Sequence, residues 1–330
     1  MKLKLSPFNY ILILLFLLAS CGKENDVRVI KLAHVLNPQH SVHRAMLFMA
    51  DRVAEKSNGK LKLEIYHSGQ LGSESQCLEL LQIGSLGITK VSTASMEGFA
   101  PSYKVLGLPY IFRSKEHMFK VEDGPIGKRI LKDGEKAWLR GLCFFDAGSR
   151  SFYTKDKPIE QPKDLDGMKI RVMKSITASK MVSELGASPM PLPFGELYTA
   201  LQQGVVDGAE NNPPSFYLTK HYEVCKYYTL NEHTSVPDVL VISTIIWDRL
   251  SDQEKQWLQE AANEAVPVQR EYWAESEAEA LAAVKAAGVE VTQLTEEEKA
   301  AFSDQVSVMY EDYKQDTLVY NLIQQIQAVE

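Results

Sequence analysis

The first third of the chain alternates short apolar runs with amphipathic segments. Runs at 29–33, 61–66 and 86–91 have the length and alternation of β-strands, and the segments 42–56 and 74–83 place apolar residues at helical spacing. This order predicts a parallel sheet with helices on its faces. Ligands of such sheets bind beyond the carboxyl ends of the strands. Three segments lie at those ends: His34 to His40, Gly69 to Glu74, and Lys90 to Thr93.

The rest of the chain repeats this alternation after a helical stretch at 115–139, in which Pro125 is expected at a helix start. A strand at 142–146 leads to a crossing into a second lobe near Ala147. The apolar strand 239–245 is predicted to return to the first lobe. The second lobe is predicted to hold strand 168–172, helix 177–185, strand 190–192, helix 196–203 and strand 205–209, and 288–292 is the last strand.

A long helix is predicted near the end of the chain. Ser251-Asp-Gln-Glu254 is a capping box, and the helical pattern behind it continues to about Ala287, with Pro267 expected to kink it. A helix of this length would exceed one small lobe, so we expect it to lie across both. The prediction is therefore an α/β fold of two lobes, each a mostly parallel sheet flanked by helices. Lobe I is assigned residues 28–147 with about 237–270, and lobe II residues 148–236 with about 271–330.

One strand of the second lobe presents an arginine at its end. Asp166-Gly167 reads as a turn, and Met168 to Val172 alternates apolar and basic residues as a half-buried strand does. Arg171 in that position is a planar fork suited to binding a carboxylate through two parallel hydrogen bonds. The alternative, an arginine on a solvated strand face, is favoured when this stretch is considered alone.

The N-terminus carries the features of an export signal. Lys2 and Lys4 precede an apolar run, Tyr10 to Leu18, that is too short to span a bilayer. The sequence Leu18-Ala-Ser-Cys21-Gly22 resembles a bacterial lipobox, in which the signal is cut before an acylated cysteine. We therefore expect a lipoprotein signal peptide at 1–20, lipidation of Cys21, and a tether at 21–27. The protein would then be periplasmic or at the cell surface, anchored to a membrane. An ordinary signal peptide with a chance cysteine is the alternative.

Charge and cysteine content exclude several classes of function. The formal net charge of −7 becomes −9 without Lys2 and Lys4, and no long basic run is present, so nucleic acid is not an expected partner. After Cys21 only three widely spaced cysteines follow, which suits small buried side chains better than disulfides or a metal site.

Signals for catalysis are weak. The sequence has no GxSxG, GxGxxG or HExxH motif. His34, His40 and His43 could suggest a metal cluster, but no acidic ligand lies beside them, and a helix entrance and surface positions are the favoured interpretation. No metal and no cofactor is expected. Polar residues at strand ends in two lobes are instead typical of a binding protein, not an enzyme.

Six motifs occur in the order found in a known family. They resemble the solute-binding proteins of TRAP transporters, of the DctP type, over the chain from about Val27 to its end. The resemblance implies a periplasmic-binding-protein-like fold whose two lobes close on a solute. It also implies delivery of that solute to small and large membrane subunits of an ion-coupled transporter. The motifs are Gly69-Gln-Leu-Gly72, Gly107-Leu-Pro-Tyr110, Gly167-Met-Lys-Ile-Arg-Val172, Gly186-Ala-Ser-Pro189, Phe194-Gly-Glu-Leu-Tyr198 and Val206-Asp-Gly-Ala-Glu-Asn211.

The resemblance assigns roles to individual residues. It implies that Arg171 binds the carboxylate of the solute and that Arg150 is a second cationic contact. Asn211 and Phe194 match further positions of the family's site. Lys174 stands where sialic-acid-binding members carry asparagine. Those members also have no equivalent of Lys90, and both differences argue against sialic acid.

This chain resembles the subset of the family that carries Thr-Lys-Val at the third strand, as at Thr89-Lys90-Val91 here, and members of that subset tend to bind hexuronates and related sugar acids. We therefore expect a sugar acid such as glucuronate or galacturonate, with His40, Glu74, Lys90 and Asn211 meeting its hydroxyls. Bland alternatives stay open: Glu74 as an acid in a first helical turn, Lys90 on the surface, and His40 as a structural residue. A dicarboxylate or keto acid as the ligand, a ligand-dependent signalling co-receptor and an enzyme acting on sugar acids also stay open.

Overall fold

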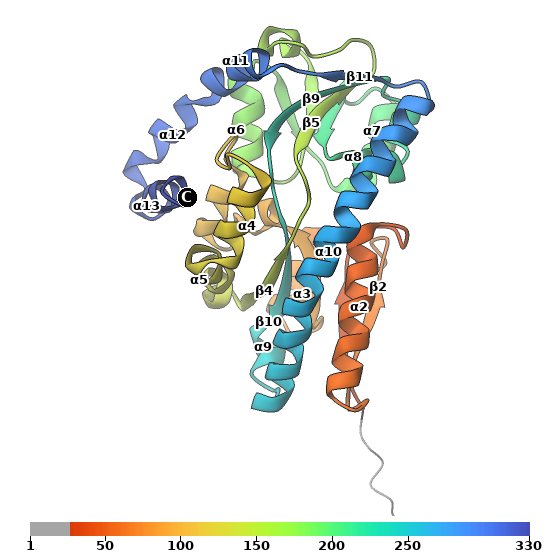
Figure 1. Ribbon diagram of the computed structural model, residues 1–330, viewed down its shortest axis with the longest axis vertical. Helices are drawn as coiled ribbons and strands as arrows, with labels where there is room; N and C mark the ends of the chain where they lie inside the picture. Colours follow the sequence, from red (N-terminus) through yellow and green to blue (C-terminus); the bar gives the residue numbers. More distant parts are fainter. Residues whose placement is uncertain (1–26) are drawn as a thin grey trace, which may run out of the picture.

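The computed structural model describes residues 27–330, which form two mixed α/β lobes around two β-sheets (Figure 1). The predicted signal peptide, Cys21 and the tether up to residue 26 lie outside the described residues. Within 27–330, no helix is long and apolar enough to cross a membrane. Cys77, Cys143 and Cys225 are free and buried, as predicted.

The first sheet confirms the predicted strand–helix order. β1, β2 and β3 pair in parallel, and the helices α2 (Ser41–Lys56) and α3 (Glu74–Gln82) connect them. The returning strand β10 lies antiparallel between β3 and β4. The order is β2-β1-β3-β10-β4, with bounds β1 Arg28–Ala33, β2 Leu61–Tyr66, β3 Ile88–Ser92, β4 Leu139–Phe145 and β10 Asp238–Ser243.

The second sheet contains a strand that the sequence analysis missed. This strand, β9, pairs antiparallel with β5 and parallel with β11, and its polar composition hides the alternation of a strand. β8 begins at Gly208, three residues after the predicted start, because Val205 and Val206 precede the ladder. The order is β11-β9-β5-β8-β6-β7, with bounds β5 Arg150–Thr154, β6 Lys169–Val172, β7 Ser188–Pro191, β8 Gly208–Asn211, β9 Tyr227–Thr234 and β11 Glu290–Gln293.

The chain crosses between the sheets twice as extended strands. β4 continues into β5 through residues 146–149, and β9 continues into β10 through residues 235–237. Every antiparallel pair of the two sheets includes at least one of these four strands, and all other pairs are parallel. Strands that merely connect two lobes therefore account for the mixed character of each sheet.

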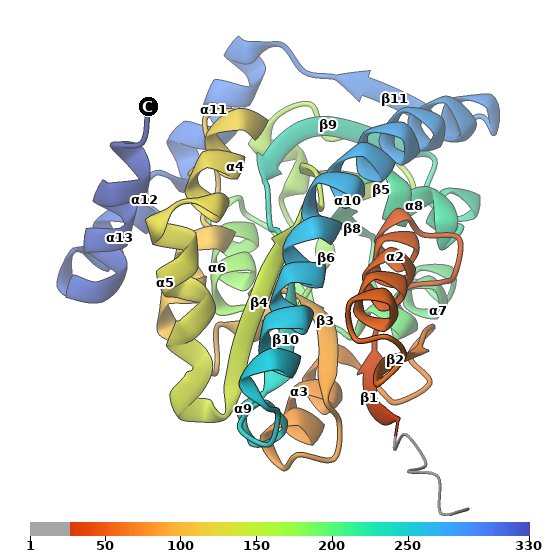
Figure 2. The ribbon, with the colours of Figure 1, turned by 60° about the horizontal axis from the view of Figure 1, so that its bottom comes forward.

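The long helix α10 (Asp252–Ala286) crosses both lobes (Figure 2). It begins at the predicted capping box and continues through Pro267, so the proline does not end it. It packs against α2 and β4 at one end and against α8 (Pro213–Leu218) at the other. Its buried Gln269 bonds to the backbone of Asp146, which ties the helix to the first crossing.

The predicted helical stretch 115–139 contains two α-helices and a 3-10 helix, and only its last residue belongs to a strand instead. Gly124-Pro125 divides it into α4 (Lys115–Asp123) and α5 (Pro125–Asp133), with Pro125 at the start of α5 as expected, and β4 already begins at Leu139. The other α-helices are α6 Ile176–Glu184, α7 Leu197–Gln202, α9 Thr244–Trp247, α11 Glu296–Val306, α12 Val308–Asp312 and α13 Thr317–Gln327. Short 3-10 helices span Thr93–Met96, Pro101–Gly107, Gly134–Ala137, Pro162–Leu165, Phe194–Glu196, His221–Glu223 and Tyr313–Gln315.

The apolar core is continuous between the lobes. Val91 and Phe144 of the first sheet belong to the same buried cluster as Phe152 and Ile170 of the second. The last helix, α13, packs against α5 and the 3-10 helix 101–107, which flank the first sheet. The residue boundaries proposed for the two lobes stay a prediction.

Candidate ligand-binding site

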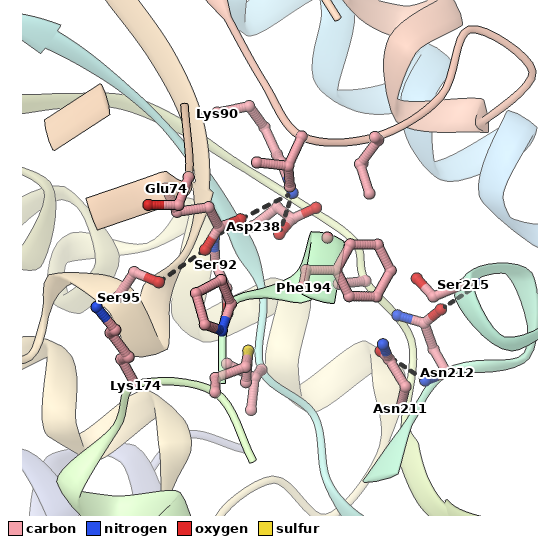
Figure 3. A pocket seen from close by; sticks show the side chains of 18 of the residues that line it. Glu74, Lys90, Ser92, Ser95, Lys174, Phe194, Asn211, Asn212, Ser215 and Asp238 are labelled. Atoms are coloured by element: carbon pink, nitrogen blue, oxygen red, sulfur yellow. Dashed lines mark hydrogen bonds and ion pairs between the residues drawn. The ribbon is translucent and has the colours of Figure 1, made fainter. Parts of the chain in front are cut away.

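The structure brings all eight predicted site residues to one cavity between the two sheets. Figure 3 labels Glu74, Lys90, Lys174, Phe194 and Asn211 among them. The residues of the second sheet lie at strand ends, because Arg171 and Asn211 stand in the last two positions of β6 and β8. The residues of the other side come from the first sheet and its helices. The cavity is lined by His40, Glu74, Lys90, Arg150, Arg171, Lys174, Phe194 and Asn211, among others.

Arg171 presents a buried guanidinium with one edge unoccupied. Its Nε and Nη2 donate to the carbonyl of Leu192 at 3.0 and 2.7 Å, and Nη1 is buried without a partner in the described chain. The side chain is 2% exposed, and none of the ion pairs among residues 27–330 includes it. Burial lowers the pKa of this arginine, but a guanidinium stays protonated in proteins. The edge formed by Nη1 and Nη2 is therefore free for a carboxylate.

Arg150 differs because its charge is already paired. Nε and Nη2 donate to the two carboxylate oxygens of Glu210, and Nη2 also donates to the Glu210 carbonyl at 2.7 Å. Burial alone would raise the pKa of Glu210, but Arg150 and His233 hold it down to about 2. Nη1 of Arg150 donates one hydrogen to Asn211 Oδ1 at 2.8 Å. One N–H of the five is left for a ligand.

Two asparagines turn their amide nitrogens to the same side of the cavity. Asn211 Oδ1 accepts from Arg150 and from the backbone N–H of Asn212. Asn212 Oδ1 caps α8 by accepting from Ser215 N at 2.9 Å. Because both oxygens are occupied, the two Nδ2 groups are the parts available to a ligand, and Figure 3 shows these side chains beside Phe194.

The opposite wall is a buried cluster of one cation between two carboxylates. Lys90 Nζ lies 2.9 Å from Asp238 Oδ1 and 3.6 Å from Glu74 Oε1. Glu74 also accepts from Ser92 N at 3.1 Å and from Ser95 Oγ at 2.7 Å (Figure 3). Burial, aided by the charge of Glu74, raises the pKa of Asp238 to about 6 although Lys90 opposes this. Lys90 is 3% exposed, so the surface interpretation of this residue is wrong.

His40 combines a structural and a site-facing role. It is the N-cap of α2, where its Nδ1 accepts from Val42 N at 3.2 Å, as the helix-entrance interpretation expects. An Nδ1 that accepts leaves the proton on Nε2, and this Nε2 is buried without a partner in residues 27–330. Burial, reinforced by the charge of Lys90, lowers the pKa of His40 to about 3, so the ring is a neutral donor.

The remaining histidines of this region are not on the surface, which corrects the sequence-based expectation. His34 and His43 are buried and joined by a 2.9 Å hydrogen bond between Nε2 and Nδ1. Leu36 N donates to His34 Nδ1, which fixes the proton of His34 on Nε2. Across the described part of the chain, no group of three or more His, Cys, Asp or Glu side chains is arranged to hold a metal ion.

Two predicted residues lie at the edge of the cavity. Lys174 is exposed on the turn after β6, and Phe194 is half-buried in a 3-10 helix, with its ring centroid 5.9 Å from the Arg171 guanidinium carbon. Sequence reasoning missed several lining residues, and Asp238 is the most consequential, because only its antiparallel pairing with β3 brings it beside Lys90. The missed lining residues with polar side-chain atoms include Ser73, Ser75, Ser92, Ser95, Asn212, Ser215, Asp238 and Trp273.

Residues 32–316 match the DctP family, described as bacterial extracellular solute-binding protein, family 7. The chain belongs to this family. This match confirms the resemblance to the DctP-type solute-binding proteins, and the description of the family places its members outside the cytoplasm. The cavity between the two sheets is therefore the candidate site for a solute.

Solved structures of other solute-binding proteins resemble this one closely. A TRAP periplasmic solute binding protein from Bradyrhizobium sp. btai1 b, in complex with α/β-D-galacturonate, is 40% identical with a TM-score of 0.88, covering 91% of this chain and 99% of the other. One from Roseobacter denitrificans with bound β-D-glucuronate is 37% identical with a TM-score of 0.88, covering 92% and 100%. The uncharacterized protein YiiZ of Salmonella typhimurium is 37% identical over 91% of each chain.

Proposed function

We propose that this solute-binding protein captures a hexuronate or a related sugar acid, such as galacturonate or glucuronate, for a TRAP transporter with small and large membrane subunits. The observation that carries the proposal is the free edge of Arg171, a buried cation with no carboxylate partner in the described chain. An unpaired buried charge is costly unless a ligand completes it. The two structural relatives with bound uronates support the same class of solute.

In this proposal, the carboxylate of the solute binds to Arg171. Nη1 and Nη2 would donate to its two oxygens, and the last N–H of Arg150 and the amide of Asn211 lie on the same side of the cavity. Because Glu210 already neutralises Arg150, the only uncompensated positive charge that this wall offers to the anion is that of Arg171. The ring of Phe194 offers an apolar surface to a face of the sugar.

The hydroxyls of the solute are placed against the other wall. Sugar hydroxyls both donate and accept, so they need a mixed set of partners. Glu74 and Asp238 supply acceptors, and Lys90 and the Nε2 of His40 supply donors. Lys174 at the mouth would attract the anion during approach and cover it after closure.

Closure of the two lobes follows from the origin of these groups. The carboxylate wall comes from the second sheet and the hydroxyl wall from the first, so a bound sugar acid would bridge both. The crossings at residues 146–149 and 235–237 are the points at which the lobes would turn. We further propose that the protein binds without turnover and that acylated Cys21 anchors it to a membrane.

Matched pairs of sugars test the proposal. Calorimetry should detect binding of D-galacturonate or D-glucuronate and no binding of D-galactose or D-glucose, which lack the carboxylate. Succinate and pyruvate represent the dicarboxylate and keto-acid alternatives. Tighter binding of either than of both uronates would overturn the sugar-acid assignment, as would mass spectrometry that found such an acid retained by the freshly purified protein.

A further inference from the structure

One end of the first lobe gathers exposed apolar side chains. Of the nine large hydrophobic side chains that are exposed in the described chain, four lie here: Val27 and Val29 at the start of β1, Ile83 after α3, and Trp138 before β4. We call these four residues, with the half-exposed Ile245 and Ile246 of α9, the end surface. The other exposed hydrophobic side chains occur singly on α2, α6, α12, α13 and the loop before β8.

The members of the end surface are neighbours in space. The Gln82 amide donates to the carbonyl of Ala137, which joins the end of α3 to the segment of Trp138. Thr244 at the start of α9 donates to the carbonyl of Trp138 at 3.0 Å. A shallow groove lined by Val29, Gly84 and Ile246 continues the surface to the start of β1. In Figure 1 this end carries α9 and the beginning of the described chain.

Trp138 is held outward at a conformational cost. It is 53% exposed and has a φ of 60°, in the left-handed region that bulky residues rarely adopt. A core tryptophan would repay such a conformation by burial, but this one is not buried in the isolated protein. Strained backbone positions are concentrated where function requires them.

The short distance in sequence between Cys21 and the first described residue, Val27, points to a lipid bilayer as the partner of the end surface. Cys21 precedes Val27 by six residues, a stretch that reaches at most about 20 Å even when fully extended. If Cys21 carries acyl chains, Val27 and the end surface around it are held within that distance of the bilayer. Tryptophan is enriched at membrane–water interfaces, and Arg249 borders the surface as a partner for lipid phosphates.

We propose that the end surface rests on the lipid bilayer and fixes the orientation of the anchored protein. This inference rests on the proposed acylation of Cys21. Trp138 and Ile83 would enter the interface, and the cavity, at the opposite ends of β1 and β3, would face away from the lipid. Because Arg28 already pairs with Glu254, we expect apolar contact to dominate and salt to have little effect.

Spin labels on the full acylated chain in phosphatidylethanolamine–phosphatidylglycerol vesicles test the proposal. Ile83→Cys carries the label on the end surface, and Ile176→Cys is its matched control, because the two side chains are 69% and 66% exposed and Ile176 lies on the second lobe. The native cysteines of the described chain are buried and should not react. On reconstitution, the label at residue 83 should gain collisions with lipid-soluble oxygen and lose collisions with a water-soluble nickel complex, and the label at residue 176 should not change.

The other outcomes separate the two proposals. If the protein floats with the vesicles but the label at residue 83 stays in water, the end surface does not dock on lipid although the anchor holds. If the label becomes protected only when the transporter membrane subunits are present, the surface binds protein and the proposal is overturned. If the protein does not float and its mass shows no acyl chains, the anchor fails first. Trp138→Ser should reduce the oxygen collisions at residue 83 while flotation is retained.

Discussion

Arg150 and Glu210 neutralise each other inside the second lobe, so the two arginines of the cavity are not equivalent. Arg150 donates four of its five N–H groups to other residues of the protein, three of them to Glu210. Arg171 donates only from Nε and from one hydrogen of Nη2, both to the carbonyl of Leu192. The pair at Arg150 is therefore part of the fold, whereas Arg171 is incomplete until an anion arrives.

Replacing Glu210 by Gln tests the structural role of this pair. The change leaves the Arg150 guanidinium buried without its counter-charge, so the free energy of unfolding should fall by about 3–5 kcal/mol. Urea denaturation measures it. Glu311→Gln is the control, because Glu311 pairs with Lys314 on the surface and its loss should cost less than about 1 kcal/mol. Equal stabilities of the two variants would contradict the account.

The other wall makes a similar prediction for Lys90. Lys90→Met removes the cation between the buried Asp238 and the half-buried Glu74 and leaves two carboxylates without it, so we expect a loss of about 3 kcal/mol in unfolding free energy. Lys174→Met is the same chemical change at an exposed position. It should leave stability unchanged and slow ligand association, most clearly at low salt. A stable Lys90→Met protein would show that this cluster does not hold the wall together.

Acid should weaken the fold through the buried histidines. Burial, then Lys90, lowers the pKa of His34 to about 2, whereas an unfolded histidine titrates near 6.5. Below about pH 6.5 the unfolded chain therefore takes up a proton that the native chain refuses, and stability is lost as the pH falls toward the native pKa. The loss is about 1.4 kcal/mol per pH unit for each such histidine.

The pKa of Asp238 is raised to about 6, so its protonation stabilises the native state as the pH falls and partly masks the loss from the histidines. Comparing a variant with the unsubstituted protein removes the contribution of Asp238, which both proteins share. The difference in unfolding free energy between the unsubstituted protein and the His34→Gln variant should become smaller as the pH falls from about 7 to about 5, because only the unsubstituted protein loses the contribution of His34. Urea denaturation of both proteins at each pH measures the difference. A difference that is independent of pH would contradict the buried, neutral state of His34.

The sequence was most informative where a local pattern determines the side chain's position. Arg171 and Asn211 could be placed at strand ends from alternation and turns, and α10 could be bounded by its capping box. The family resemblance then supplied roles that periodicity does not contain. His40 could be placed at a helix entrance, but its unpartnered Nε2 depends on the tautomer that the cap selects.

What the sequence did not provide depends on contacts between distant segments. Asp238 meets Lys90 only because β10 returns antiparallel to β3, and no spacing in the sequence encodes that register. Glu210 belongs to the motif Val206-Asp-Gly-Ala-Glu-Asn211, but the motif does not reveal its partner, because Arg150 lies on β5, sixty residues earlier. β9 was missed because its residues, such as Asn231 and Glu232, are polar, and its place in the sheet comes from pairing with β5.

Closure predicts a change of shape in solution. A sugar acid that contacts Arg171 on one lobe and Glu74 on the other should shift the protein toward the closed state. Small-angle scattering with saturating D-galacturonate should show a smaller radius of gyration than scattering without it. D-galactose is the control and should have no effect. Identical profiles with and without galacturonate would contradict a bridging ligand.

The central claim is that Arg171 binds the carboxylate of a sugar acid, and calorimetry of Arg171→Ala with D-galacturonate tests it most directly. Losing one partner of a buried, hydrogen-bonded charge pair costs about 2–5 kcal/mol. Binding should therefore weaken by about thirtyfold or more, while Arg249→Ala, at an exposed arginine outside the cavity, should bind as the unsubstituted protein does. A folded Arg171→Ala protein whose affinity changes by less than about threefold would contradict the account.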